Sequence, residues 1–239
     1  MPMESYLYHG QAFGFEADIW EPGPYKIDGH ARCGLPDKKP GRYTGQQDAF
    51  EIPSVMSHGG CTSVVHAMDE DREGFFRTEI SATLNDLRVE GDALTVDRIE
   101  FGMVTMYRRH WFDSGKRHAR RVRVVPYGCR LVNLRVKGQA VQDLLPAPFH
   151  YSKDRCEEYL RADDPDSTVE AEIRKAITGS PSRCMYIKNF GRIFLGEWTL
   201  LPNEDWHPIH QISMLRMALG SPQSGNGTGT GGQGDGTGG

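Results

Sequence analysis

Hydrophobic and polar residues alternate with a period of two along much of this chain. The pattern is clear in residues 5–20, 75–89 and 99–107, where apolar or aromatic side chains alternate with small or polar ones. Such alternation is typical of pleated strands, because a helix would bring similar side chains together every 3.6 residues. Shorter runs predict additional strands at 63–68, 121–125, 129–136, 192–201 and 210–219, and the last of these is also compatible with a short helix.

One phrase of the sequence occurs twice. Residues 85–94 read NDLRVEGDAL and residues 132–141 read VNLRVKGQAV. Leucine, valine and glycine recur at matching places, and Gly91 and Gly138 stand where a turn or bulge favours a residue without a Cβ. The repeat predicts two equivalent strand–turn–strand units, and both gene duplication and independent use of one strand pattern explain it.

A single helix is predicted near residues 168–178. Ser167 and Glu170 have the spacing of a capping box, in which each side chain satisfies a free backbone N–H. Val169, Ile173 and Ala176 fall on one stripe, and Gly179-Ser180-Pro181 ends the segment. Residues 21–48 are dense in Pro, Gly, Asp and Lys, which predicts mostly loop.

The predicted elements define a mainly β fold. Strands in hairpin-like succession favour an antiparallel sandwich or barrel over alternating βαβ units. We expect a single β-rich domain at 1–219 with one short helix. Residues 220–239 form a Gly-rich, low-complexity stretch that lacks apolar area to offset its ordering entropy, so a flexible, disordered tail is expected.

Composition narrows the class of protein. The net charge of -4 with 25% charged residues excludes a globally basic nucleic-acid binder but not a local basic patch. No stretch reaches the roughly 18 apolar residues of a membrane span, and residues 1–15 lack the pattern of a secretory signal. Five cysteines without a Cys-x-x-Cys pair favour free thiols in a cytoplasmic protein.

Several blocks resemble known families. YLYHGQAFGF, TLNDLRVEGDALTVDRIEF, GCRLVNLRVKGQAV, GRIFLGEWTLLPNE and SMLRMALG occur in an order similar to that of the choice-of-anchor P proteins, which are β-rich bacterial domains. In its overall character the chain also resembles the peptide-binding accessory proteins of crocagin-type ribosomal-peptide pathways. These resemblances imply a β-rich fold and a binding role, with no catalytic residues and no cofactor to carry over.

Candidate chemistry is sparse. His207 and His210 stand three apart with Glu204 just before them, which is a permissible but unspecific pattern for a metal site in a loop. His58 and His30, near Cys61 and Cys33, could complete such a site only through folding. No Gly-x-Ser-x-Gly elbow or phosphate-binding Gly-rich loop occurs, so a non-catalytic role is favoured while enzyme activity stays open.

A basic run at 108–123 holds seven Lys or Arg residues with aromatic residues between them. It could bind phosphates, a peptide carboxylate or an acidic leader, since arginine pairs a carboxylate at two points. It could equally be a solvated hairpin, or face the segment 154–172, which carries eight acidic residues. Nucleic acid is therefore disfavoured. The candidate peptide-binding residues are Arg108, Arg109, Trp111, Phe112 and Trp198, of which Trp198 is also a natural core residue.

Three functions follow from these observations. The first is a non-catalytic peptide-binding protein that takes an extended peptide on a sheet edge, in the setting of precursor-peptide presentation that the second resemblance implies. The second is a metal-dependent enzyme acting on a peptidic or small substrate through His207, His210 and Glu204. The third is a structural protein that self-associates through its sheet edges. A homodimer is also compatible with the peptide-binding function. The first is the prediction we carry forward.

Overall fold

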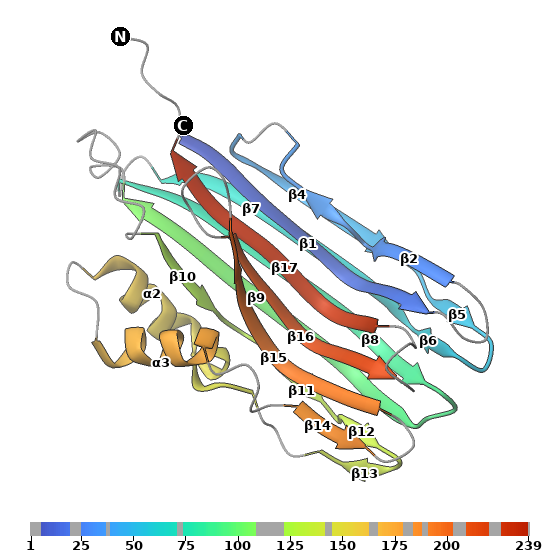
Figure 1. Ribbon diagram of the computed structural model, residues 1–239. Coiled ribbons are helices and arrows are strands. Elements are labelled where there is room, and N and C mark those ends of the chain that lie inside the picture. Colours follow the sequence, from blue (N-terminus) through green and yellow to red (C-terminus); the bar gives the residue numbers. More distant parts are fainter. Residues whose placement is uncertain are drawn as a thin grey trace.

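The computed structural model describes residues 6–19, 25–36, 39–70, 74–108, 122–141, 145–162, 167–178, 184–187, 191–202, 209–219 and 226–238. These residues form two antiparallel sheets that pack face to face, with helices at one side (Figure 1). The mainly β, antiparallel fold predicted from the alternating pattern is therefore confirmed. None of the helices in these ranges is long and apolar enough to cross a membrane.

Sheet A has seven strands, and it joins the two ends of the described chain. Its order is β14-β15-β16-β17-β1-β2, and the short β3 pairs with β1 beyond β2. The strands are β1 (Tyr6–Ile19), β2 (Tyr25–His30), β3 (Cys33–Gly34), β14 (Cys184–Ile187), β15 (Gly191–Leu201), β16 (Ile209–Leu219) and β17 (Asn226–Gly238).

Sheet B has ten strands built around one long hairpin. Its strands are β4 (Gly41–Gln47), β5 (Phe50–Ile52), β6 (Met56–His58), β7 (Gly60–Glu70), β8 (Phe75–Val89), β9 (Leu94–Arg108), β10 (Arg123–Pro126), β11 (Arg130–Val132), β12 (Arg135–Val136) and β13 (Gln139–Ala140). β8 and β9 pair along their whole length. On the far side of β9, the strands β10, β11 and β12 follow one another as three short pieces.

The hydrophobic core lies between the two sheets. Ile80, Leu84 and Met103 of sheet B are fully buried, as are Ile212 and Met214 of sheet A. Burying a side chain of this size contributes about 1.5–3 kcal/mol relative to exposure, so the alternating apolar residues of β8, β9 and β16 account for the stacking of the sheets.

Three helical segments lie at the side of the sandwich where β10 and β15 run. They are η2 (Ala147–His150), α2 (Lys153–Arg161) and α3 (Ser167–Thr178), and α3 confirms the predicted helix. α2 packs on β10, while α3 packs on β15 and η2. The sequence did not reveal α2, because its buried stripe consists of Cys156, Tyr159 and Leu160 alone in a nine-residue segment rich in charges.

Two predictions about irregular segments are wrong. Within 21–48, predicted as loop, the chain forms β2, β3 and β4. Residues 226–238 are not a flexible tail: they form β17, which pairs with β1 on one side and β16 on the other. The glycine-rich composition predicted disorder, but it does not reveal the backbone hydrogen bonds that the two neighbouring strands supply. These bonds offset the entropy cost of ordering the segment.

The repeated phrase forms two adjacent strand–turn–strand units, as predicted. Asp86 and Asn133 occupy matching places and have φ of 49° and 53°, and Glu90 and Lys137 have φ of 47° and 48°. The second unit pairs with the first, since β12 lies against the start of β9. The repeat therefore encodes one local backbone path that sheet B uses twice, side by side.

Candidate functional site

Arg108 contacts the C-terminal end of α2. It ends β9, and its Nη2 donates to the carbonyl oxygens of Arg161 at 2.6 Å and Ala162 at 2.7 Å. These carbonyls belong to the C-terminal end of α2, where a cation is favourable because the last helical carbonyls lack partners within the helix. The nomination of Arg108 for a peptide carboxylate is therefore replaced by a structural role.

Trp198 is a core residue in this structure. Its side chain is 0% exposed, and its indole N–H donates to Nδ1 of His210 at 3.1 Å. The ring stands edge-on to Phe149, with centroids 6.4 Å apart. A side chain without exposed surface cannot anchor a peptide, so this nomination is corrected as well. Arg109, Trp111 and Phe112 lie outside the described residues.

The candidate metal site is only partly described. His207 and Glu204 lie outside the described residues, and His210 is engaged by Trp198. Burial lowers the pKa of His210 to about 4, which favours the neutral ring. In the part of the chain that the structure describes, no cluster of three or more His, Cys, Asp or Glu residues is arranged to hold a metal ion.

The fold does bring His30 and His58 together. Nδ1 of His30 lies 2.9 Å from Nε2 of His58, and the Gly60 N–H donates to Nδ1 of His58 at 3.2 Å. Because Nδ1 of His58 accepts, its Nε2 carries the proton and donates to His30. Burial lowers the pKa of His58 to about 4, with a further contribution from His30. The pair is therefore a neutral, internal link between the two sheets.

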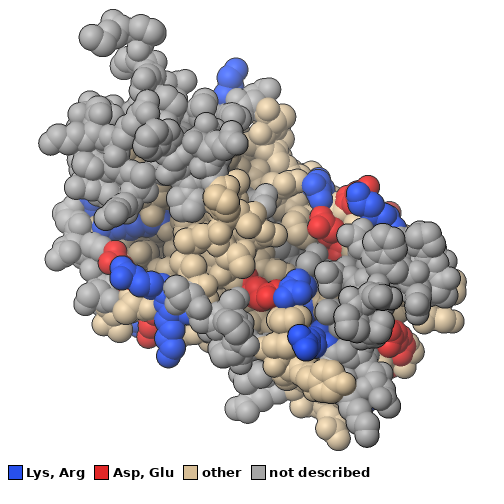
Figure 2. Space-filling view, viewed as in Figure 1, with Lys and Arg blue, Asp and Glu red and all other residues tan. Residues whose placement is uncertain are grey.

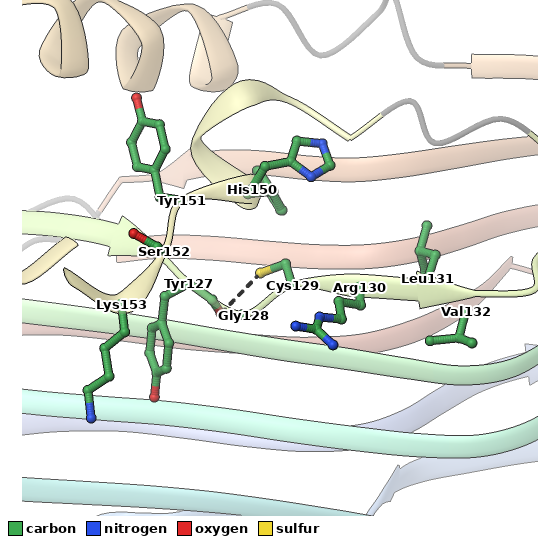
Figure 3. Close-up of a pocket in the computed structure, with 11 residues that line it drawn as sticks. Tyr127, Gly128, Cys129, Arg130, Leu131, Val132, His150, Tyr151, Ser152 and Lys153 are labelled. Atoms are coloured by element: carbon green, nitrogen blue, oxygen red, sulfur yellow. Dashed lines mark hydrogen bonds between the residues drawn. The ribbon is translucent and has the colours of Figure 1, made fainter. Parts of the chain in front are cut away.

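A groove of about 720 Å³ lies beside β11, at the border of sheet B opposite the one that holds His58. One wall is the segment 127–132, which includes β11, and the other is the segment 149–153, which runs from the end of η2 to the first residue of α2. β11 pairs with β9 on one side, and no described strand covers its other side. Figure 3 shows the two segments crossing, with Arg130 and Val132 pointing to one side of β11 and Leu131 to the other.

The backbone of β11 presents hydrogen-bonding groups at this open border. The N–H of Tyr127 donates to the carbonyl of Gly102 at 2.9 Å, so even-numbered residues of this part of β9 direct their backbone groups toward β10 and β11. Arg130 and Val132, which face Glu100 and Arg98, therefore bond inward. Antiparallel ladders alternate, so the N–H and C=O of Leu131 point away from β9.

The far wall of the groove is fixed by side-chain contacts. The hydroxyl of Tyr151 donates to Glu172 of α3, and Arg155 stacks on the Tyr151 ring at 4.6 Å. Ser152 caps α2 by accepting the N–H of Arg155 at 3.2 Å. The wall is therefore held in place before any ligand arrives, which lowers the entropic cost of binding.

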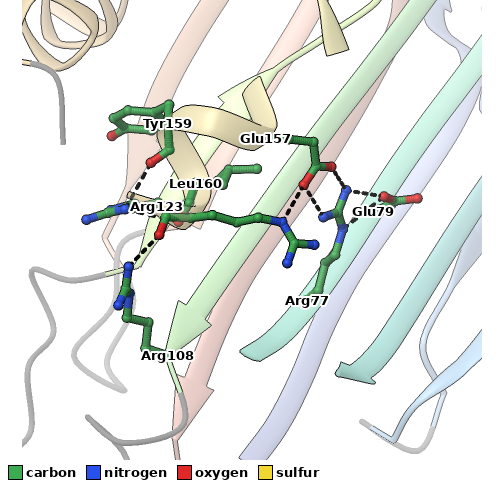
Figure 4. Close-up of polar contacts among 8 residues, drawn as sticks. Arg77, Glu79, Arg108, Arg123, Glu157, Tyr159 and Leu160 are labelled. Carbon is green, nitrogen blue, oxygen red and sulfur yellow. Dashed lines mark hydrogen bonds and ion pairs between the residues drawn. The ribbon is translucent and has the colours of Figure 1, made fainter. Parts of the chain in front are cut away.

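A polar network holds α2 against sheet B (Figure 4). Arg77 of β8 donates Nε to Glu79 at 2.9 Å and Nη1 to Glu157 of α2 at 2.9 Å, and its side chain is 5% exposed. Arg123 of β10 donates to the carbonyls of Tyr159 at 2.9 Å and Leu160 at 3.0 Å. The described ends of the basic run thus face the acidic segment, as one of the sequence alternatives had it, through helix carbonyls.

The cysteine and tyrosine side chains at and near the groove have raised pKa values. Burial raises the pKa of Cys129, which lines the groove, to about 12 and that of Cys156 on α2, which does not line it, to about 11, so both remain thiols at neutral pH. A thiol is a poor nucleophile compared with a thiolate. Burial also raises the pKa of Tyr127 to about 12. These side chains are therefore uncharged at neutral pH.

Charges are distributed unevenly between the groove and its surroundings. Arg130 and Lys153 are the charged side chains among the eleven lining residues, and no carboxylate lines the groove in the described structure. On the face drawn in Figure 2, Lys, Arg, Asp and Glu side chains are interspersed over the described residues. The groove therefore offers positive charge at a local site on a mixed surface.

The other long borders of the sheets are less open. Lys26 and Asp28 form an exposed ion pair on β2, with Nζ 3.0 Å from Oδ1, and charged edge strands resist the addition of another strand. β4, the border of sheet B opposite β11, is covered by β2 and β3, which pack against it. A smaller groove of about 500 Å³ lies beside β3 and β4, whereas the border at β11 combines outward backbone groups with a groove of about 720 Å³.

Comparison with known proteins places this geometry in a family. Residues 6–166 match the family described as "Domain of unknown function (DUF8256)", which is more than half of the chain. The chain belongs to this family. The DUF8256 match includes all of sheet B, both walls of the groove and α2, but only β1, β2 and β3 of sheet A.

The remaining comparisons add no functional description. No curated protein and no solved structure matches the chain. The resemblances to choice-of-anchor P proteins and to crocagin-type accessory proteins stay predictions. The groove itself was missed by sequence reasoning, because its walls come from segments about twenty residues apart that only the docking of α2 brings together.

Proposed function

We propose that this DUF8256 protein is a non-catalytic peptide-binding protein that receives an extended segment along the open border of β11. The observation that carries the proposal is a groove of about 720 Å³ beside a strand that has a described partner on one side only. An added strand gains affinity from main-chain hydrogen bonds and specificity from alternate side-chain positions. Leu131 supplies the backbone groups and the preformed 149–153 wall encloses the guest.

The chemistry of the lining residues supports holding over cutting. The Cys129 thiol, which lines the groove, is protonated at neutral pH because burial raises its pKa. Tyr151 is engaged by Glu172, and Ser152 caps α2. These groups are committed to the wall, so we assign them no catalytic role.

The biological setting of the proposal is the cytoplasmic presentation of a precursor peptide for modification. The resemblance to crocagin-type accessory proteins motivates the precursor peptide. All five cysteines are free, which agrees with a reducing compartment. In this setting the protein positions the peptide, and a separate enzyme carries out the chemistry.

Selection from a random peptide library displayed on phage tests the proposal directly. The immobilised full-length chain should enrich peptides that bind with micromolar or better Kd by calorimetry. Leu131→Pro removes the outward N–H and leaves the bonds of Arg130 and Val132 to β9, so it should weaken binding at least about tenfold. Leu131→Ala, the matched control, keeps the N–H and should weaken binding less.

Two further measurements keep the result interpretable. Circular dichroism and thermal melting establish that both Leu131 variants fold, and N-methylation of a selected peptide at alternate positions tests the backbone bonds from the guest side. No enrichment, or equal binding to the Pro and Ala variants, contradicts the proposal. Pairing of two copies along β11 is the competing outcome, and concentration-dependent light scattering without peptide would reveal it.

A further inference from the structure

Two side chains next to the open border of β11 share one face of the strand. Arg130 and Val132 stand two residues apart, on either side of Leu131. The Arg130 side chain is 73% exposed and Val132 is 37% exposed, which makes Val132 one of the few large apolar residues at the described surface. A guest strand at this border would place its own side chains directly opposite both of them.

Arg130 is only weakly engaged within the protein. Its Nε lies 3.9 Å from Oε2 of Glu100, whereas Arg98 reaches Oε1 of the same carboxylate at 3.0 Å. Glu100 thus has a closer partner than Arg130. Because the guanidinium is largely in solvent, it can turn toward a guest carboxylate and bind it at two points.

The opposite wall reinforces the positive charge. Lys153 is exposed at the first position of α2 and lines the groove with Arg130. Figure 3 shows Lys153, Tyr127 and Arg130 directed to the same side. With two cations and no carboxylate among the described lining residues, the groove complements a negatively charged guest.

We propose that the β11 groove selects extended peptide segments in which an acidic residue and an apolar residue are separated by one position. The acidic residue pairs with Arg130 and the apolar residue packs on Val132. An antiparallel guest carries the apolar residue first and a parallel guest carries the acidic residue first. This inference rests on the proposed function, because it names the class of peptide that the same site takes.

Six capped heptapeptides of Ser and Thr test the inference. Two carry Glu and Val two positions apart, in either order, two replace Glu with Lys, and two replace Val with Thr. On the full-length protein, one order of the Glu–Val pair should bind best by calorimetry. Its Lys counterpart should bind about fivefold more weakly, because cross-strand charge pairs contribute up to about 1 kcal/mol. The Thr counterpart should lose about two- to threefold.

Charge reversal in the protein provides the decisive arm. Arg130→Glu should invert the preference, so that the Lys peptide binds more tightly than the Glu peptide. The matched control is Arg135→Glu: Arg135 is also exposed, but β13 pairs with its strand and it does not line the groove. That variant should keep the wild-type preference. In 1 M salt the preference for Glu should shrink, because screening acts on exposed charges.

The outcomes separate the inference from the function on which it rests. Equal binding of the Glu and Lys peptides, or no inversion by Arg130→Glu, overturns the inference while library-selected peptides that depend on Leu131 still support the proposed function. Binding of none of the six peptides also overturns the inference. The proposed function falls with it only when the library yields no peptide either.

Discussion

Arg77 of β8 and Glu157 of α2 form a two-point ion pair across the boundary between sheet B and the helices. Only 5% of the Arg77 side chain is exposed, against 25% for Glu157. The pair fixes α2, and α2 in turn positions the far wall of the groove. The stability of the groove is therefore linked to a buried guanidinium that does not line it.

Removing this guanidinium should destabilise the protein. Arg77→Met leaves Glu79 and Glu157 close together without their shared cation, so the free energy of unfolding should fall by about 2–3 kcal/mol. Urea unfolding followed by circular dichroism measures the change. Arg88→Met is the control: Arg88 pairs with Asp92 at 2.9 Å, but both side chains are more than half exposed, so the loss should stay below about 1 kcal/mol.

Acid should weaken the fold in a defined window. His58 has a pKa of about 4 in the folded protein and 6.5 as its ordinary value, and the pKa of His30 is also lowered by burial. As the pH falls from 6.5 toward 4, the unfolded chain takes up protons that the folded chain refuses. Each such histidine lowers the free energy of unfolding by at most about 1.4 kcal/mol per pH unit. Above pH 6.5 these groups contribute no pH dependence.

Unfolding measured at half-unit steps between pH 8 and pH 4 checks this window. His58→Gln should flatten the slope. Glu157 adds a separate loss at lower pH, because its hydrogen bond to Arg77 holds its pKa below 4.5. A slope that is identical in wild type and His58→Gln would contradict the assignment of a neutral His30–His58 pair.

The turn between β12 and β13 can be improved. Lys137 and Gly138 form its two-residue loop with φ of 48° and 76°. Asparagine tolerates positive φ better than lysine, and Asn-Gly is a favoured pair in such hairpins. Lys137→Asn should therefore raise the free energy of unfolding by about 0.5 kcal/mol. Arg135→Asn, in the strand itself, should lower it instead, since asparagine is a poor strand former.

Gly102 is required by the close approach of Tyr127. A Cβ at this position would lie 2.6 Å from the Tyr127 carbonyl oxygen and 2.9 Å from its ring. Gly102→Ala should lower the free energy of unfolding by about 1–3 kcal/mol through overpacking. It should also displace the groove wall, so the binding of a selected peptide should weaken. Gly128→Ala meets nothing within 4 Å and is strained only by its φ of 59°, so it should cost about 1 kcal/mol. Thermal melting and calorimetry with one peptide compare the two variants.

The sequence predicted elements whose signal is local. The alternation in residues 75–89 and 99–107 became the central hairpin of sheet B, and the helix predicted at 168–178 became α3. β4 was missed because GRYTGQQ has no apolar alternation, and its pairing with β7 decides its conformation. Such tertiary pairing overrides local preference, which is why loop composition misled.

The site was less predictable because it depends on contacts between distant segments. Arg108 looked like a ligand-binding cation, since nothing in the sequence says that the C-terminal end of α2 lies beside β9. The available signal was the basic run followed by an acidic segment, a juxtaposition that Arg108 and Arg123 realise by donating to carbonyls at the end of α2. Arg130 and Val132 gave no signal, because their exposure follows from the absence of a described neighbour strand.

The position of β17 has a consequence for the integrity of sheet A. Seven of its 13 residues are glycine, and it is the strand through which β14–β16 connect with β1–β3. The two halves of this sheet, β1–β3 and β14–β16, come from opposite ends of the described chain. Among the described strands, they are joined only through the backbone hydrogen bonds that β17 forms with β1 and β16. A shift of register by one residue moves few side chains in a glycine-rich strand, so the register of β17 against its neighbours is weakly specified. We therefore expect sheet A to separate at β17 before the β8–β9 hairpin of sheet B unfolds.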